Sequence, residues 1–235
     1  MRNAIDPPTA SALREAFNRF DLDDSLAVAV LTGAGGTFCA GFDLKALASG
    51  AGYGDLKGPG PMGPTRMTVS KPVLAAIEGY AVAGGLELAL WCDLRVAASD
   101  ATLGVFNRRF GVPLIDMGTV RLPRIVGQGR ALDLILTGRP VKAEEALRIG
   151  LVDRVVEPAQ GLAQAQRLAR EIAAFPQAAL RADRESVLHQ WGMGLEEAAE
   201  AELTYGVKAI STGEAIEGAQ RFAGGEGRHG ASARR

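Results

Sequence analysis

Two hydrophobic periods alternate along the chain, and they predict its helices and strands. Residues 9–21, TASALREAFNRFD, carry apolar side chains every three to four positions and predict a helix with Thr9 as the candidate N-cap. Residues 26–32, LAVAVLT, form a short apolar run that is typical of a buried strand. This alternation continues through the first half of the chain and indicates an α/β fold.

Two further stretches repeat the order strand, glycine turn and short helix. Residues 38–47, FCAGFDLKAL, predict a strand end that passes into a helix at Asp43. Residues 71–81, KPVLAAIEGYA, predict one strand, residues 85–92 a helix and residues 93–99 another strand. The unit recurs, so the glycine turns are expected to occupy equivalent places.

The remaining segments divide the chain into a core and a helical region. Residues 49–67 are rich in glycine and proline, which is typical either of a mobile functional loop or of disorder. From residue 118 onward the pattern is mostly helical. We therefore predict a core over residues 1–156, a helical region over 157–222 and a disordered tail over 223–235.

Composition and charge exclude several classes of protein. The 235 residues are 47% hydrophobic and carry 26 basic and 27 acidic side chains, a net charge of −1. This balance argues against nucleic acid or an anionic membrane as the main partner. No run reaches the roughly 18 apolar residues that span a bilayer, and no signal-peptide pattern is visible, so we expect a cytoplasmic protein.

Cysteine and histidine offer little for catalysis or metal binding. Cys39 and Cys92 lie in apolar contexts without CxxC spacing, so neither a disulfide nor a thiolate metal site is expected. His189 and His229 lie in the C-terminal fifth of the chain, far in sequence from the glycine-rich motifs. We expect no metal site and no Ser-His-Asp or Cys-His mechanism.

The candidate chemistry lies in the glycine turns. GAGG at 33–36 lacks the spacing of a phosphate loop and is interpreted as a turn that ends a strand. CAGFD would leave the Phe42 amide free, and AGGLE would free the Gly84 amide one turn before Glu87. Two such amides on one oxygen form an oxyanion hole. Alternatively, the glycines serve only packing and Glu87 complements a helix dipole.

Three segments together resemble a known family. TFCAGFDLKAL, KPVLAAIEGYAVAGGLELALWCDLRVAASDATLGV and ILTGRPVKAEEALRIGLVDRVV are similar in order and spacing to the crotonase superfamily, the enoyl-CoA hydratase/isomerase proteins. The resemblance implies a spiral of ββα units with a C-terminal helical trimerisation region, assembled as a homotrimer or homohexamer. It also implies acyl-CoA thioester substrates, and no separate cofactor because coenzyme A is part of the substrate.

The resemblance also assigns roles to residues. The Phe42 and Gly84 amides would hold the thioester oxygen as it becomes an enolate, and Glu87 would act as the acid/base. The residues expected to line the coenzyme A channel are Ala40, Gly41, Asp43, Leu44 and Lys45.

The chain departs from the family pattern at the second acid. Asn107 stands where hydratases usually carry another glutamate, and an amide can hold water but cannot transfer its proton at neutral pH. Asp116 is the nearest replacement, although it could equally cap the helix that starts near Gly118. Two-glutamate hydration is thus in doubt, and isomerisation is favoured because it needs only one base. A non-catalytic acyl-CoA-binding paralogue and a dehalogenase- or hydrolase-like enzyme using Asp116 remain alternatives.

A second departure concerns the start of the spiral. The family usually has a strand pair before the segment RNAID, which here starts at residue 2. Either the start was assigned late or the first strand pair is absent, and a missing strand would leave an exposed sheet edge.

Overall fold

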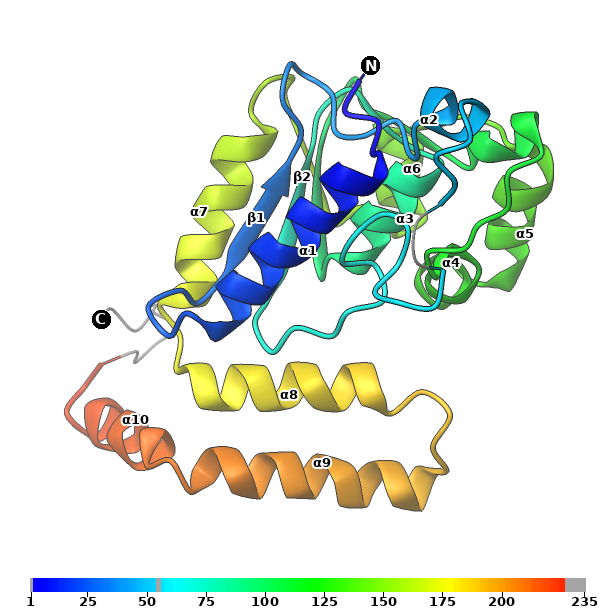
Figure 1. The fold of residues 1–235 in the computed structure, drawn as a ribbon. Coiled ribbons are helices and arrows are strands. Elements are labelled where there is room, and N and C mark those ends of the chain that lie inside the picture. Colours follow the sequence, from blue (N-terminus) through cyan, green and yellow to red (C-terminus); the bar gives the residue numbers. More distant parts are fainter. Residues whose placement is uncertain (1, 54–55, 227–235) are drawn as a thin grey trace. The chain divides into compact units, whose positions relative to one another are not determined.

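The computed structural model describes residues 2–53 and 56–226, and the chain divides into two compact units. The first unit is Met1–Ala169 and the second is Arg170–Arg235. Figure 1 shows strands and helices in the first unit and helices in the second. The boundary predicted between residues 156 and 157 stays a prediction. The contacts between residues divide the chain later, within helix α7 (Gly161–Ala173).

A parallel sheet forms the centre of the first unit. Its order is β1 (Ala29–Thr32), β2 (Val73–Ile77), β4 (Leu94–Ala98) and β7 (Arg154–Val156). All three pairings are parallel, and every residue of β2 is buried. The apolar runs predicted as buried strands are therefore strands of one sheet, and β1 forms one of its edges among the described residues.

A second, smaller sheet corrects the prediction of a single strand over residues 71–81. It contains β3 (Tyr80–Val82), β5 (Thr102–Gly104) and β6 (Val141–Lys142). The chain leaves the first sheet after Ile77 and turns at Gly79, whose φ of 54° lies in the left-handed region that favours glycine. One apolar run thus supplies strands to two sheets.

The N-terminal helix α1 (Pro7–Leu22) starts earlier than predicted. Its N-cap is Asp6, whose side chain accepts a hydrogen bond from the Thr9 N–H at 2.9 Å, so the assignment of Thr9 as the cap was wrong. The apolar face of α1 reaches the core, where the Phe17 ring lies 4.7 Å from the Trp91 ring, centroid to centroid.

The other helices of the first unit surround the sheets. Helix α3 (Gly84–Trp91) is buried at every position from Gly85 onward, which explains why its sequence is apolar throughout except at Glu87. The remaining elements are α2 (Leu44–Ala48), the short 3-10 helix η1 (Phe106–Phe110), α4 (Gly118–Val126), α5 (Gln128–Thr137), α6 (Ala143–Arg148) and α7 (Gly161–Ala173).

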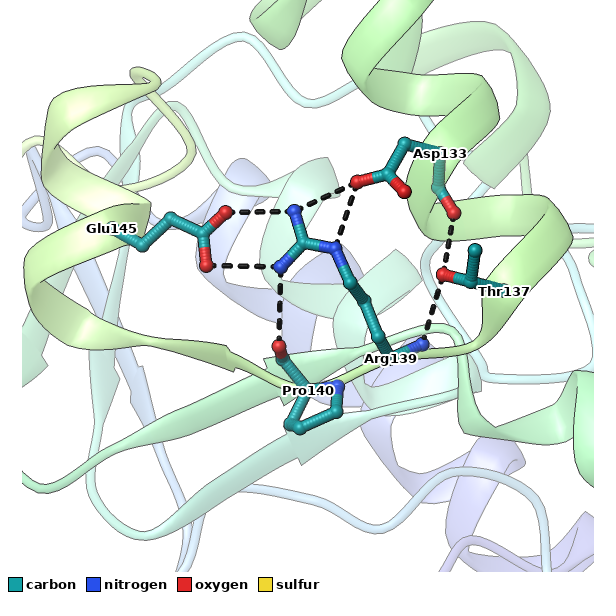
Figure 2. A network of polar contacts seen from close by, with 5 residues as sticks. All are labelled: Asp133, Thr137, Arg139, Pro140 and Glu145. Atoms are coloured by element: carbon teal, nitrogen blue, oxygen red, sulfur yellow. Dashed lines mark hydrogen bonds and ion pairs between the residues drawn. The ribbon is translucent and has the colours of Figure 1, made fainter.

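An ion-pair network fixes the turn between α5 and β6. The Arg139 guanidinium donates to Asp133 at 2.7 Å and to both carboxylate oxygens of Glu145 at 2.7 and 2.9 Å (Figure 2). The neighbouring Gly138 carbonyl accepts a hydrogen bond from Arg109 of η1 at 2.9 Å. The network therefore stabilises the turn to which Arg109 of η1 is hydrogen-bonded. Residues of η1 line the cavity described below.

The described part of the second unit is helical, as the sequence pattern predicted. Helices α8 (Gln177–His189) and α9 (Leu195–Ile210) run antiparallel and pack together, followed by α10 (Glu214–Ala223) (Figure 1). None of the three has a buried residue. Their role in trimerisation stays a prediction. Of the predicted disordered tail, residues 227–235 lie outside the described residues. No helix in the described part of the chain is long and apolar enough to cross a membrane.

Candidate active site

The first glycine turn closely approaches the second. Gly41 has a φ of 97°, and a Cβ atom there would lie 2.9 Å from the Gly84 nitrogen and 3.2 Å from the Val82 carbonyl oxygen. Only glycine permits both the backbone conformation and this approach. The two turns are far apart along the chain but are in contact in the fold.

The second turn has an unusual backbone. Ala83, just before helix α3, has φ 54° and ψ −128°, a conformation that costs a side-chain-bearing residue energy and is typical of functional sites. Among the backbone hydrogen bonds of the described residues, neither the Phe42 N–H nor the Gly84 N–H is a donor. Both amides are thus available for an external acceptor.

Glu87 is held by a pocket of main-chain amides. Its Oε1 atom accepts hydrogen bonds from the Asp116 N–H at 2.9 Å and the Gly118 N–H at 2.8 Å. Between these residues Met117 adopts a left-handed conformation, φ 70° and ψ 13°, so that the flanking N–H groups converge on one oxygen. Glu87 is only 3% exposed, and no described residue donates a hydrogen bond to Oε2.

The surroundings of Glu87 raise its pKa to about 7. Burial is the largest cause, and the negative charge of Asp116 adds to it. The two amides and the positive charge of Arg121 oppose the rise. A carboxyl group whose pKa lies near neutrality can both accept and donate a proton.

The Asp116 side chain does not cap helix α4, but accepts hydrogen bonds from the loop at residues 56–67. The N-cap of α4 is Met117, and no side chain caps that helix, so the capping hypothesis for Asp116 was wrong. Its Oδ1 atom accepts hydrogen bonds from the Met62 N–H at 3.0 Å and from the Thr65 hydroxyl. Asp116 is 2% exposed, and burial raises its pKa above the ordinary value.

The loop rich in glycine and proline forms part of this site. Thr65 and Met62 are fully buried, and Arg66 donates to the carbonyl oxygens of Leu56 and Ile115. Residues 56–67 thus fit the functional-loop alternative rather than disorder. The sequence interpretation missed both Thr65 and Met62. The contact explains Gly60, whose φ is 112° and whose added Cβ would lie 2.2 Å from the Thr65 hydroxyl oxygen. In the sequence, one glycine in a stretch rich in glycine does not indicate this contact.

A cavity of about 170 Å³ joins these groups. Its lining residues are Ala40, Phe42, Leu44, Tyr53, Pro61, Met62, Val82, Ala83, Gly84, Glu87, Phe106, Asn107, Phe110, Val112, Pro113, Ile115 and Asp116. Among the residues predicted to bind substrate, Gly41, Asp43 and Lys45 are not in this lining. Gly41 packs against the second turn, and Asp43 caps α2 by accepting the Lys45 N–H at 2.8 Å.

Asn107 also lines the cavity, from η1. It is 7% exposed, and its Nδ2 donates to the Val112 carbonyl at 2.8 Å, which fixes the orientation of the amide. Its Oδ1 is buried without a hydrogen-bond partner among the described residues.

Arg121 is a further charged group, and it contacts Asp116. Its Nη1 donates to the Asp116 main-chain oxygen at 3.3 Å, and its positive charge lowers the pKa of both Glu87 and Asp116. The sequence interpretation missed it, because nothing in a helical run indicates which arginine turns toward a buried acid. Within residues 2–53 and 56–226, no cluster of His, Cys, Asp or Glu could hold a metal ion.

Comparisons with known proteins point to one family. The family model for enoyl-CoA hydratase/isomerase matches residues 1–228. A carnitinyl-CoA dehydratase from Salmonella arizonae is 41% identical over 83% of this chain and 76% of its own length. An (E)-benzylidenesuccinyl-CoA hydratase from Thauera aromatica is 40% identical over 83% of this chain and 77% of its own.

Solved structures give the same result. The crystal structure of an enoyl-CoA hydratase from Mycobacterium tuberculosis superposes with a TM-score of 0.90 and 38% sequence identity. The match covers 94% of this chain and 87% of that one.

Proposed function

The chain belongs to the enoyl-CoA hydratase/isomerase family, and we propose that it catalyses the reversible addition of water to the Cα–Cβ double bond of an enoyl-CoA thioester. The predicted crotonase-like α/β fold and the acyl-CoA-processing class are thereby confirmed. One observation carries the choice of reaction: Glu87 and Asp116 place two buried carboxyl groups on one cavity. Relatives named as hydratase and dehydratase support it.

The Phe42 and Gly84 amides bind the thioester oxygen in this proposal. Negative charge develops on that oxygen when water attacks Cβ, and two fixed N–H donors stabilise it without reorganisation. Support comes from the contact between the two turns and from the absence of another acceptor for either amide within the described residues. Removing one such donor typically costs about 3 kcal/mol of transition-state stabilisation.

Glu87 acts as the base toward water. Its Oε1 is occupied by the two amides of the α4 turn, which leaves Oε2 to accept the proton. Water supplies hydroxide to Cβ as its proton passes to Glu87. A pKa of about 7 is suited to a base that must release the proton again in each cycle.

Asp116 takes the place of the missing second glutamate as the proton donor to Cα. Burial raises its pKa above the ordinary value, and the Oδ1 contacts leave Oδ2 without a hydrogen bond from the described residues. In this proposal Asp116 carries a proton when the substrate binds. The enolate accepts the Asp116 proton, and the proton held by Glu87 restores the pair. Dehydration follows the same steps in reverse, and neither direction needs a separate cofactor.

Asn107 and the first turn serve binding. The Asn107 amide cannot transfer a proton at neutral pH, so its part is limited to shaping the cavity or holding water. The segment Ala40–Lys45 flanks the thioester site and is proposed to bind the coenzyme A portion.

Isomerisation remains a second candidate because Asn107 occupies the position of the second glutamate. Incubation with 2-enoyl- and 3-enoyl-CoA, followed by mass spectrometry, separates the reactions. Hydration adds the mass of one water, whereas isomerisation moves the double bond at constant mass. Glu87→Gln and Asp116→Asn should each abolish the water adduct, and Asp100→Asn at an exposed carboxylate is the matched control.

Three results would overturn the proposal. Constant mass with a shifted double bond would establish isomerisation. A covalent adduct trapped on Asp116 would establish a nucleophilic reaction of the dehalogenase or hydrolase type. Unchanged acyl-CoA binding and stability in Glu87→Gln, with no activity on any acyl-CoA, would indicate a non-catalytic binding protein.

A further inference from the structure

The polar side chains of the cavity include no cation. Its only acidic, amide or hydroxyl side chains are Glu87, Asp116, Asn107 and Tyr53, and the rest of the described lining is apolar or glycine. No lysine, arginine or histidine belongs to this described lining. A bound acyl group therefore meets hydrocarbon surface and two carboxyl groups, without a cation.

Hydrogen bonds within the protein already occupy part of each of these polar side chains. Each carboxyl group has one oxygen occupied by protein donors and the other without a hydrogen bond from the described residues. The Asn107 amide uses its Nδ2 to donate to the Val112 carbonyl. These side chains thus leave the free oxygens of two carboxyl groups for the ligand, and no positively charged donor.

Three arginines that lie within five residues of the lining in sequence are engaged elsewhere. Arg121 donates to the main-chain oxygen of Asp116, and Arg66 donates to Leu56 and Ile115. Arg109 donates to Gly138, and its guanidinium lies 3.8 Å from the Phe106 ring centroid. Each would have to abandon its present contacts to neutralise an anion in the cavity.

We propose that this acyl pocket accepts neutral, hydrocarbon-rich acyl groups and discriminates against acyl groups that end in a carboxylate. The inference rests on the proposed function for the identity of the ligand as an acyl-CoA. A second carboxylate would lose its hydration against apolar walls and would stand near the ionised Glu87 without a compensating cation in the described lining. A neutral chain of the same length meets neither penalty.

The test uses saturated thioesters, which bind but cannot be hydrated. Glutaryl-CoA and its terminal amide, 4-carbamoylbutanoyl-CoA, differ at the acyl end mainly in charge, and pentanoyl-CoA is the hydrocarbon reference. Calorimetric Kd values should rank pentanoyl-CoA tightest and should favour the amide over glutaryl-CoA by at least about tenfold. Equal or tighter binding of glutaryl-CoA overturns the inference.

The origin of the discrimination is tested with Glu87→Gln, Asp116→Asn and the double variant. Removal of both ionisable groups should reduce the amide-to-glutarate preference at least about threefold, and Glu87→Gln should account for most of the change, while the cost of desolvation against the apolar walls remains. An unchanged ratio in folded variants would contradict a role for the carboxylates. Because the measurement involves no turnover, it is independent of hydration: an inactive protein can still show the preference, and an active hydratase can lack it.

Discussion

The two buried carboxyl groups face one cavity but are held in different ways. Glu87 is fixed by main-chain amides on either side of Met117, which belong to one rigid turn. Asp116 is fixed by an amide and a side-chain hydroxyl from the loop at residues 56–67. A backbone support can be removed only by blocking it sterically, whereas the side-chain support at Thr65 can be removed by one conservative substitution.

The largest effect is expected from Gly118→Ala. The new Cβ would lie 2.7 Å from Glu87 Oε1 and 3.0 Å from Cδ, so the carboxylate must leave its amide pocket. Hydration should fall about a thousandfold, as for loss of a general base. Gly129→Ala in α5, where the added Cβ meets nothing within 4 Å, should keep the wild-type rate. Comparable rates for the two variants would show that the amide pocket is unimportant.

Burial of Glu87 should make stability fall as pH rises. Because its pKa increases from 4.5 to about 7 on folding, the folded protein binds more protons between these values. At about 1.4 kcal/mol per pKa unit, the loss should reach about 3 kcal/mol above neutrality. Urea unfolding of wild type and Glu87→Gln at about pH 5 and about pH 8 isolates this contribution. Parallel changes in both proteins would rule it out.

Thr65→Val tests the side-chain support of Asp116. Asp116 becomes charged as it releases its proton in the proposed step. Loss of a hydrogen bond to a charged group costs about 1.5–3 kcal/mol, so hydration should fall about tenfold to a hundredfold. Without this donor the Asp116 pKa should rise further, which moves the alkaline limb of the kcat/KM profile to higher pH. Thr65→Ser retains the hydroxyl and should restore both. A Thr65→Val profile equal to wild type would separate Asp116 from proton transfer.

The smallest effect is expected at Arg121. Its charge lowers the pKa of Glu87, so Arg121→Met should move the acidic limb of kcat/KM upward by less than about one pH unit. At pH values above that limb the rate should match wild type. Arg121 lowers the pKa of the carboxyl groups and donates to the Asp116 main-chain oxygen, but it does not line the cavity. A uniform loss of activity at every pH would instead indicate a structural role.

Local patterns in the sequence predicted the elements better than their connections. The apolar runs at β2 and β4 and the helix at α3 were recognisable because each is continuous and largely buried. The run at β1 was recognisable as a strand, but the prediction that it is buried was wrong, because β1 is a partly exposed edge strand among the described residues. The single strand predicted over residues 71–81 failed because the left-handed turn at Gly79 sends the chain into a second sheet. A hydrophobic run reports burial but not which sheet receives it.

The same limit applies to the site. Glu87 was conspicuous as an acid inside an apolar helix, and glycines indicated the two turns beside it. Thr65 and Arg121 carried no such contrast with their neighbours, since their roles depend on contacts with Asp116 and Glu87 across the fold. Asp116 was found by position, yet its partners could be assigned only once the loop was in place.

The central claim is that Glu87 and Asp116 act as one proton-transfer pair, and a double-mutant cycle tests it most directly. Rates of 2-enoyl-CoA hydration are compared for wild type, Glu87→Gln, Asp116→Asn and the double variant. If the pair works as a unit, each single change should lower kcat about a thousandfold, and the double variant should be no slower than the poorer single variant by more than about threefold. Wild-type kcat in Asp116→Asn, or losses that multiply in the double variant, would contradict the account.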